Sequence, residues 1–166
     1  MKSLKSLSVL MMASVLFFAC KKESQSTLQV KLTDAPADLD EVNIDLKAVN
    51  VNFRDDSTGW VSLQTKDTIY NLLGLQNGLD TLIAQGTFPT NTVKEIRLVL
   101  GDNNSVKVNG QVYPLIIPSG STSGLKIKVN KKLNATLETV VIDFDAGMSV
   151  TQEQDGYKLR PVIKVK

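Results

Sequence analysis

The clearest structural pattern in this chain lies in residues 41–53, EVNIDLKAVNVNF. Apolar side chains alternate with polar ones from Val42 to Ala48, and a second alternating series, displaced by one position, runs from Val49 to Phe53. Alternation with a period of two is typical of a strand that buries one face. A displacement by one residue would turn the apolar side chains to solvent unless the strand accommodates an extra residue, so the pattern predicts a β-bulge near Ala48.

The same alternation recurs on both sides of this segment. Shorter strands are expected in residues 28–32, 60–63, 68–73, 95–100, 106–108, 111–117, 125–129, 140–144 and 157–165. Asn109 and Gly110, which tolerate positive φ, predict a tight hairpin between two of these strands. Pro161 has no backbone N–H to donate, so the last strand should be an edge strand or contain a break.

Residues 72–83 fit two structures. Leucines at helical spacing favour a helix, but Gly74 and Gly78 would each weaken it by about 1 kcal/mol relative to alanine. We therefore expect a strand, a turn at residues 76–78 and a second strand, with one helical turn as the alternative. About ten short strands, with little helix beyond the N-terminal segment, predict an all-β fold in which residues 28–166 form one antiparallel β-sandwich.

The N-terminus has the pattern of an export signal. Lys2 and Lys5 precede an apolar run that is shorter than the roughly 20 residues of a membrane-spanning helix. Residues 16–20, LFFAC, resemble a lipobox, in which the cysteine after the cut is acylated. We interpret residues 1–19 as a lipoprotein signal peptide and residues 20–27 as the lipidated Cys20 with a flexible tether. An uncleaved anchor, in which Cys20 is a buried apolar residue, is the alternative.

A lipidated Cys20 implies an address in the cell envelope. Each buried methylene of an acyl chain such as palmitate contributes about 0.8 kcal/mol, so a multiply acylated cysteine holds a protein firmly. We expect the chain to be anchored to the outer membrane through Cys20. The sequence is compatible with the periplasmic face and with the extracellular face.

The composition excludes many functions. The chain has no histidine and one cysteine, which removes Ser–His and Cys–His catalysis, zinc sites that use these residues, and haem or iron–sulfur ligation. Lys2 and Lys5 account for the formal net charge of +2, so the remaining chain is formally neutral and offers no basic stripe for nucleic acid. We therefore expect no cofactor, no nucleic-acid partner and no enzymatic activity.

Several short clusters stand out along the chain. They are Leu32–Pro36, Gly59–Trp60, Glu95–Leu98, Gly101–Asn103, Ser123–Lys126, Ile142–Ala146 and Leu159–Ile163. In this order and spacing they resemble the domain of unknown function 4382 family, over roughly residues 27–165. The resemblance implies a β-sandwich of secreted or lipid-anchored prokaryotic proteins, broadly similar to prealbumin-like and immunoglobulin-like modules. It implies no catalytic residues.

Five aspartates are candidate calcium ligands. Asp34, Asp38 and Asp40 are close in sequence, and Asp143 and Asp145 share one face of another expected strand. If the fold brings these side chains together, their oxygens suit Ca²⁺, which takes about six to eight oxygen ligands. We favour the alternative, in which Asp34 and Asp38 accept backbone hydrogen bonds in a turn while Asp143 and Asp145 are solvated or paired with Lys or Arg.

Few aromatic side chains are available for stacking against a ligand. Trp60, Tyr70, Tyr113 and Tyr157 are candidates for a sugar-stacking face. We expect Trp60 instead to fill the core of the sandwich, since a large aromatic residue at the start of a strand is usually buried.

Three short motifs resemble an O-glycan acceptor used by some Gram-negative exporters. They are Asp56–Thr58, Asp67–Ile69 and Asp80–Leu82. The acceptor hydroxyls in these motifs belong to Ser57, Thr68 and Thr81, which are therefore candidate glycosylation sites.

Together these features favour a non-catalytic, lipid-anchored envelope protein that binds a ligand or has a structural role. One alternative is an adhesin-like surface module that binds a carbohydrate or a protein. A second alternative is a small hydrolase that uses Asp143 or Asp145. Such an enzyme requires an open cleft with two carboxylates about 5–9 Å apart.

Overall fold

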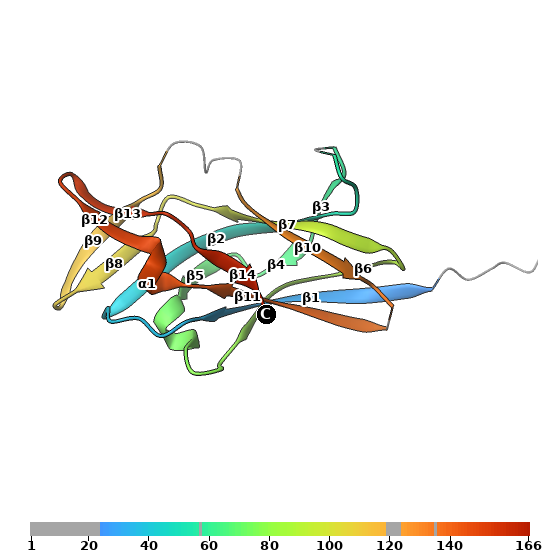
Figure 1. The fold of residues 1–166 in the computed structure, drawn as a ribbon, viewed down its shortest axis with the longest axis horizontal. Coiled ribbons are helices and arrows are strands. Elements are labelled where there is room, and N and C mark those ends of the chain that lie inside the picture. The colour runs from blue at the N-terminus through green and yellow to red at the C-terminus, as the bar shows by residue number, and fades with distance from the viewer. Residues whose placement is uncertain (1–23, 57, 119–123, 135) are drawn as a thin grey trace, which may run out of the picture.

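The computed structural model describes residues 24–56, 58–118, 124–134 and 136–166. In chain order, its elements are β1 (Gln25–Asp34), β2 (Glu41–Asn52), β3 (Trp60–Ser62), β4 (Gln64–Thr65), β5 (Thr68–Asn71), η1 (Leu72–Leu75), β6 (Thr81–Pro89), β7 (Thr92–Leu100), β8 (Ser105–Val108), β9 (Gln111–Ile116), β10 (Leu125–Lys132), β11 (Leu137–Phe144), α1 (Ala146–Ser149), β12 (Val150–Glu153), β13 (Gly156–Leu159) and β14 (Ile163–Val165). Two sheets form an elongated sandwich, which confirms the predicted all-β sandwich (Figure 1). Within these residues, no helix is long and apolar enough to cross a membrane.

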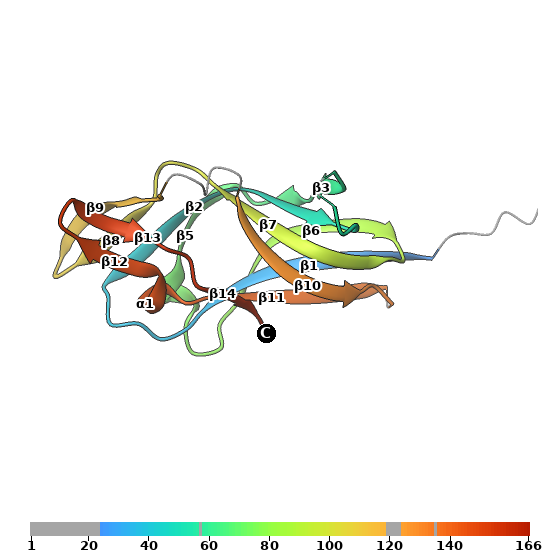
Figure 2. The same ribbon diagram turned by 45° about the horizontal axis from the view of Figure 1, so that its top comes forward.

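The two sheets differ in size. One has five strands in the order β14-β11-β1-β6-β4, and the other has nine, in the order β10-β7-β2-β8-β9-β13-β12 with β3 and β5 added to β2. In Figure 2 the strands β7 and β10 of the larger sheet run past β1 and β11 of the smaller sheet. The described residues thus contain fourteen strands where about ten were expected, because pairs as short as β4 with β6 were not apparent from alternation.

Parallel pairing is the main departure from the expected topology. Most neighbouring strands are antiparallel, but β1 pairs with β11, and β13 with β9, in parallel. The sheets are therefore mixed, which corrects the expectation of a purely antiparallel sandwich. A hairpin imposes antiparallel pairing, whereas a long connection such as the one from β1 to β11 leaves the direction of the strand free.

Strand β2 contains the predicted bulge. Its pairing with β7 shifts register between Leu46 and Ala48, and Lys47 is exposed at this point while Leu46 is buried. The extra residue lets both apolar series of the strand face the core. The hairpin between β8 and β9 is also confirmed, with φ angles of 51° at Asn109 and 79° at Gly110.

Residues 72–83 combine the two structures considered for them. η1 forms a single helical turn, and the side chain of Asn71 caps it by accepting a hydrogen bond from the N–H of Leu73. The chain then turns, with φ angles of 59° at Asn77 and 83° at Gly78, and enters β6. The expected turn at residues 76–78 is confirmed, and the segment just before it is the helical turn rather than a strand.

The boundaries of three strands show where the chain enters the sandwich and where it passes from one sheet to the other. β13 ends at Leu159 in the larger sheet and β14 begins at Ile163 at the edge of the smaller one, so the predicted break at Pro161 is where the chain changes sheets. β1 begins at Gln25, so residues 25–27 belong to the sandwich and not to the expected tether.

The core lies between the sheets and consists of the alternate apolar residues of their strands. Leu28 of β1 and Phe144 of β11 are among the largest side chains that are fully buried. Burying a side chain of this size stabilises a fold by about 1.5–3 kcal/mol. With a single cysteine in the chain, the sandwich relies on this core and not on an internal disulfide.

Candidate functional site

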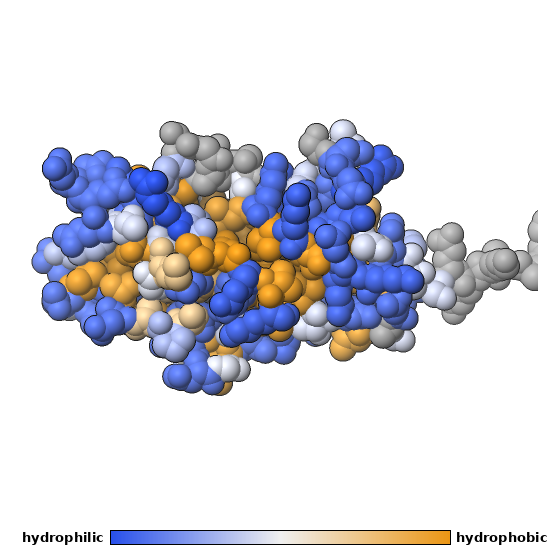
Figure 3. Space-filling view, in the orientation of Figure 1, coloured by the Kyte–Doolittle hydropathy of each residue, from blue (hydrophilic) through white to orange (hydrophobic). Residues whose placement is uncertain are grey.

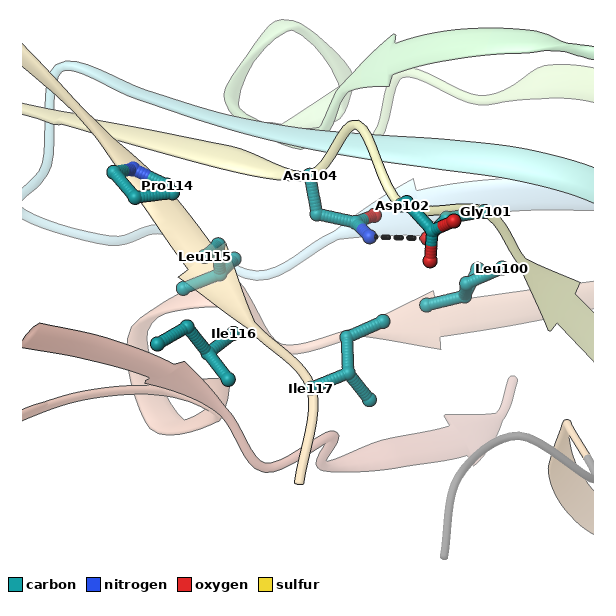
Figure 4. A pocket seen from close by; sticks show the side chains of 8 residues that line it. All are labelled: Leu100, Gly101, Asp102, Asn104, Pro114, Leu115, Ile116 and Ile117. Atoms are coloured by element: carbon teal, nitrogen blue, oxygen red, sulfur yellow. Dashed lines mark hydrogen bonds between the residues drawn. The ribbon is translucent and has the colours of Figure 1, made fainter. Parts of the chain in front are cut away.

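The candidate ligand site is a pocket between the end of β9 and the connection from β7 to β8. It has a volume of about 320 Å³ and is lined by Leu100, Gly101, Asp102, Asn104, Pro114, Leu115, Ile116 and Ile117. Figure 4 shows the side chains of residues 114–117 on one side and those of Leu100 and Asp102 across from them. Polar and apolar groups line the pocket in about equal measure, so it offers a small molecule both apolar contact and hydrogen bonds.

A buried aspartate fixes the wall of this pocket to β2. Asp45, which is 1% exposed, accepts a hydrogen bond from the N–H of Asn103 at 3.2 Å and pairs with Nζ of Lys47 at 2.9 Å. The N–H of Asp45 donates to Oδ1 of Asn104 at 2.9 Å, and Nδ2 of Asn104 donates to the carbonyl of Gly101 at 2.6 Å (Figure 4). Burial favours the neutral acid, but the bonds from Lys47 and Asn103 outweigh burial and hold the pKa of Asp45 below its ordinary value.

Asp34 is a structural carboxylate at the end of β1. It is 2% exposed, its Oδ1 accepts a hydrogen bond from the N–H of Ala146 at 2.8 Å, and its Oδ2 accepts one from Nε2 of Gln76 at 3.2 Å. Burial raises the pKa of Asp34 above its ordinary value, and the negative charge of Asp145 adds to the rise, although these hydrogen bonds oppose it. Both oxygens of Asp34 therefore serve protein donors.

Asp143 and Asp145 also have structural contacts. Asp143 is 2% exposed, and its Oδ2 lies 3.2 Å from Nζ of Lys164 and 3.4 Å from Nζ of Lys166. Its Oδ1 has no hydrogen-bond partner within the described part of the chain. Asp145 caps α1 by accepting a hydrogen bond from the N–H of Met148 at 2.9 Å. The pairing of Asp143 with lysine agrees with the interpretation favoured from the sequence.

The five aspartates do not converge on one ion position. Asp38 and Asp40 are exposed, and Oδ2 of Asp40 accepts a hydrogen bond from the N–H of Gly110 at 2.7 Å, across to the β8–β9 hairpin. In the ranges that the structure covers, no three acidic or cysteine side chains are grouped to hold a metal ion. The oxygens of Asp34, Asp40 and Asp145 instead accept backbone hydrogen bonds.

Trp60 does not lie in the core, so that expectation is wrong. It is half-buried, the guanidinium of Arg97 stacks 4.4 Å from the centroid of its ring, and Nζ of Lys126 lies 6.0 Å from the same point. The reason is the register of β3: Trp60 pairs with Asn52, whereas the fully buried apolar residue of β2 at this point is the adjacent Val51. Successive residues of a strand face opposite sides, so Trp60 faces away from the core.

The tyrosines lie apart from Trp60. Tyr113 of β9 and Tyr157 of β13 have ring centroids 5.0 Å apart, and these strands lie at the end of the sandwich opposite to β3 (Figure 1). Tyr70 lies on β5, where its hydroxyl donates to the carbonyl of Lys66 at 3.0 Å. The four aromatic residues therefore do not form one sugar-stacking face.

The candidate modification sites differ in accessibility. Thr68 is exposed at the start of β5, and Thr81 is half-buried at the start of β6. Ser57 and Cys20 lie outside the described residues. Of the candidate glycan acceptors that the structure describes, Thr68 is thus the more accessible.

An apolar band crosses the face of the molecule shown in Figure 3, flanked by hydrophilic side chains. It lies over the region where β10, β11 and β14 run in Figure 1, and β10 and β14 are edge strands of the two sheets. The exposed side of β10 carries Lys126, Lys128 and Lys132. Lysines on an edge strand discourage pairing with other chains.

Comparison with protein families identifies the family of this domain. A family described as a domain of unknown function (DUF4382) matches residues 25–161, nearly the whole of the sandwich. The chain belongs to the DUF4382 family. A search of the curated proteins and a search of the solved structures found no match to the chain.

The clusters by which the sequence resembles other DUF4382 domains meet in two places. Asp34 and Ala146 join two of these clusters, and the N–H of Asp145 donates at 3.0 Å to the carbonyl of Val162, which lies in a third.

Trp60, Arg97 and Lys126 come from three further clusters and meet at the indole ring. These residues belong to the motifs that resemble the family, but the sequence does not place them in one site. Their contact depends on the register of β3 with β2 and of β7 with β10, which short motifs do not specify.

Proposed function

We propose that this chain is a non-catalytic, lipid-anchored protein of the outer membrane whose DUF4382 domain binds a ligand. The observation that carries the proposal is the position of the pocket relative to β1. The pocket lies beside β9, one of the two strands of the β8–β9 hairpin. The chain enters the sandwich at one end, at the start of β1, and the β8–β9 hairpin lies at the other end (Figures 1 and 2). A chain held by a lipid on Cys20, which precedes β1 by a few residues, presents the hairpin end of the sandwich away from the membrane.

The chemistry of the pocket supports binding rather than hydrolysis. Asp102 is the one ionisable residue among those that line it, whereas a hydrolase of the carboxylate type uses two carboxyl groups about 5–9 Å apart. The earlier candidates for hydrolysis, Asp143 and Asp145, are held by two lysines and by the first turn of α1. An adhesin-like module, which holds a carbohydrate or a protein on the cell surface, is one form of the same function.

The anchor is tested by metabolic labelling with a radioactive palmitate analogue in the native host. The wild-type protein should be labelled and should fractionate with the outer membrane. The Cys20→Ala variant should be unlabelled and soluble, whereas the matched variant Ser24→Ala, also close to the proposed cut, should behave as wild type. An unlabelled wild-type protein that fractionates like Cys20→Ala contradicts the anchor.

The adhesin-like form is tested by protease treatment of intact cells. Digestion of the domain on whole cells places it on the outside of the outer membrane and supports this form. Protection until the outer membrane is breached places the domain in the periplasm, and the adhesin-like form is then wrong while ligand binding inside the envelope stands.

A further inference from the structure

The outer face of the nine-stranded sheet carries two cations in an unfavourable arrangement. Arg97 of β7 and Lys126 of β10 occupy directly opposite positions in the pairing of these strands. Like charges at opposite positions destabilise a sheet. Neither side chain forms an ion pair with an acidic group in the part of the chain that the structure describes. The repulsion between the two cations therefore opposes this pairing, and an anion bound against them relieves it.

Both cations are gathered over the ring of Trp60. The guanidinium of Arg97 lies 4.4 Å, and Nζ of Lys126 lies 6.0 Å, from the ring centroid. The face of an indole ring attracts cations, which holds the two side chains together in spite of their repulsion. Nε of Arg97 is buried and has no hydrogen-bond partner in the described residues. The guanidinium therefore keeps at least one donor that the described part of the protein does not use.

Gly124 makes this close arrangement feasible. Its φ is +83°, and a Cβ atom at this position would lie 2.7 Å from Cγ of Arg97. A side chain there would push Arg97 away from the ring of Trp60. The backbone next to β10 thus leaves room for Arg97 to lie flat against the indole.

Hydrogen-bonding groups extend from these cations across the sheet. Asn50 of β2 lies opposite Arg97 on one side and opposite Ser62 on the other. Oγ of Ser62 donates to Oδ1 of Asn50 at 2.8 Å. Hydroxyl, amide, guanidinium and ammonium groups therefore form a row across the four adjacent strands β3, β2, β7 and β10, beside a half-exposed aromatic ring.

We propose that Trp60, Arg97 and Lys126, here called the Trp60 site, bind a saccharide that carries a carboxylate. The carboxylate accepts hydrogen bonds from the guanidinium and the ammonium group, and the sugar ring lies beside the indole, one face of which Arg97 already covers. Of the other polar groups in the row, Ser62 is exposed and can contact the sugar hydroxyls, whereas Asn50 is buried and positions Ser62. This inference rests on the proposed binding function and names a ligand class for a surface separate from the pocket of Figure 4.

The extent of the positive charge favours a small acidic saccharide over a nucleic acid or an anionic membrane. Lys128, the next outward lysine of β10, lies opposite Glu95, so a pair of opposite charges separates Arg97 and Lys126 from Lys132, which lies opposite Thr92 further along the strand. Nucleic acids and membrane surfaces are recognised by longer basic stripes or clusters. A single pair of cations beside one aromatic ring suits one charged sugar unit.

Trp60 provides the signal for the test, because it is the only tryptophan of the chain. Tetragalacturonate, which carries a carboxylate on each sugar, is titrated into the purified protein while tryptophan fluorescence is recorded. We expect a saturable change that weakens as salt is added. Uncharged maltotetraose should bind at least about tenfold more weakly, since the charged hydrogen bonds are missing.

Matched variants separate this site from a structural role. Arg97→Gln and Lys126→Gln should each weaken tetragalacturonate binding by about five- to tenfold or more. Lys126→Gln should also melt at the same or a higher temperature than wild type, because it relieves the repulsion from Arg97. Lys128→Gln, one outward position further along β10, should change the affinity by less than about twofold.

Four results would overturn the proposal. They are the absence of a fluorescence change at millimolar tetragalacturonate, equal binding of maltotetraose, unchanged affinity in Lys126→Gln, and binding of phosphatidylglycerol vesicles without binding of tetragalacturonate. Each concerns the Trp60 site alone. The palmitate and protease experiments test the anchor and the membrane face independently, so failure of the Trp60 site is distinguishable from failure of the proposed anchored location.

Discussion

The carboxylate of Asp34 and the backbone N–H of Ala146 are joined by a buried hydrogen bond of 2.8 Å between the end of β1 and the start of α1. The other carboxylate oxygen accepts a bond from Gln76, just after η1. One side chain thus holds together three segments that are far apart in the sequence, at a place where only 2% of its surface is exposed.

Asp34→Ala should therefore lower the free energy of unfolding by about 1–3 kcal/mol, because it leaves the buried N–H of Ala146 without an acceptor. Asp34→Asn keeps an acceptor oxygen and should cost less at pH 7. Urea unfolding of both variants beside wild type measures these differences. Asp67→Asn, which changes an aspartate whose side chain is 58% exposed, is the control and should stay within about 0.5 kcal/mol of wild type.

The pKa of Asp34 also predicts a pH dependence. Burial raises the folded-state pKa above the unfolded value of about 3.9, so the folded protein binds this proton more tightly. The stabilising contribution is complete below the unfolded pKa and is lost as the pH rises through the folded pKa. Asp34→Asn lacks this loss, so its unfolding free energy relative to wild type should increase between pH 3.5 and pH 7. Equal pH profiles for the two proteins would contradict the raised pKa.

Gly101→Ala should destabilise the wall of the pocket by roughly 1–3 kcal/mol, the usual cost of overpacking. A Cβ atom at this position would collide with Oδ2 of Asp45 and lie 2.6 Å from Cε of Lys47. Gly74→Ala is the matched control, since a Cβ atom there meets nothing within 4 Å. We expect Gly74→Ala to be neutral or stabilising by up to about 1 kcal/mol. Thermal melting of both variants provides the comparison, and a neutral Gly101→Ala would show that the loop moves freely.

Calcium should not stabilise the domain. The candidate ligands Asp34, Asp40 and Asp145 accept backbone hydrogen bonds, and Asp143 is paired with two lysines. Melting curves recorded in millimolar calcium and after chelation with EDTA should therefore coincide. A rise of several degrees with calcium that disappears in EDTA would restore the calcium hypothesis, and Asp38→Asn would then be the first variant to examine.

O-glycosylation, if the host attaches it to the predicted motifs, should favour Thr68 over Thr81. Thr68 is exposed, whereas Thr81 is half-buried at the start of β6. The intact mass of the protein purified from its native host should then contain hexose, and peptide mapping should place more of it on Thr68. Thr87, an exposed threonine that follows a glycine, is the internal control. An intact mass equal to that of the unmodified chain would contradict the prediction.

Local patterns predicted those parts of the fold that depend on neighbouring residues. The phase change in β2 indicated the bulge at Lys47, and Asn109–Gly110 indicated the hairpin, because positive φ and side-chain alternation are properties of a few consecutive residues. The parallel pairing of β1 with β11 was not predictable in this way. It joins segments with no turn between them, and the amino-acid pattern of each strand is compatible with either direction.

In the candidate sites, too, features set by the residue itself were easier to predict than features set by strand pairing. Asp143 is paired with lysine, as one favoured interpretation had it, whereas Asp34 accepts hydrogen bonds from Ala146 and Gln76 and not from its own turn. Trp60 was misplaced because its residue type favours the core, whereas the register of β3 turns it outward. Arg97 and Lys126 become neighbours only through the pairing of β7 with β10, so no local pattern could assign them to one site.

The central position of β1 has a consequence for how the domain matures. In the five-stranded sheet β1 lies between β6 and β11, and Leu28 pairs with Glu138. A chain that emerges from its N-terminus first cannot complete this sheet until β11 has emerged, and pairings so distant in sequence slow folding. For a chain tethered at Cys20, as proposed, the strand nearest the anchor can pair with β6 first and gains its second partner, β11, only later. On that proposal, the chain is attached at its N-terminus before the sheet around β1 is complete, so the interval between anchoring and folding is set by the most distant pairing of the fold.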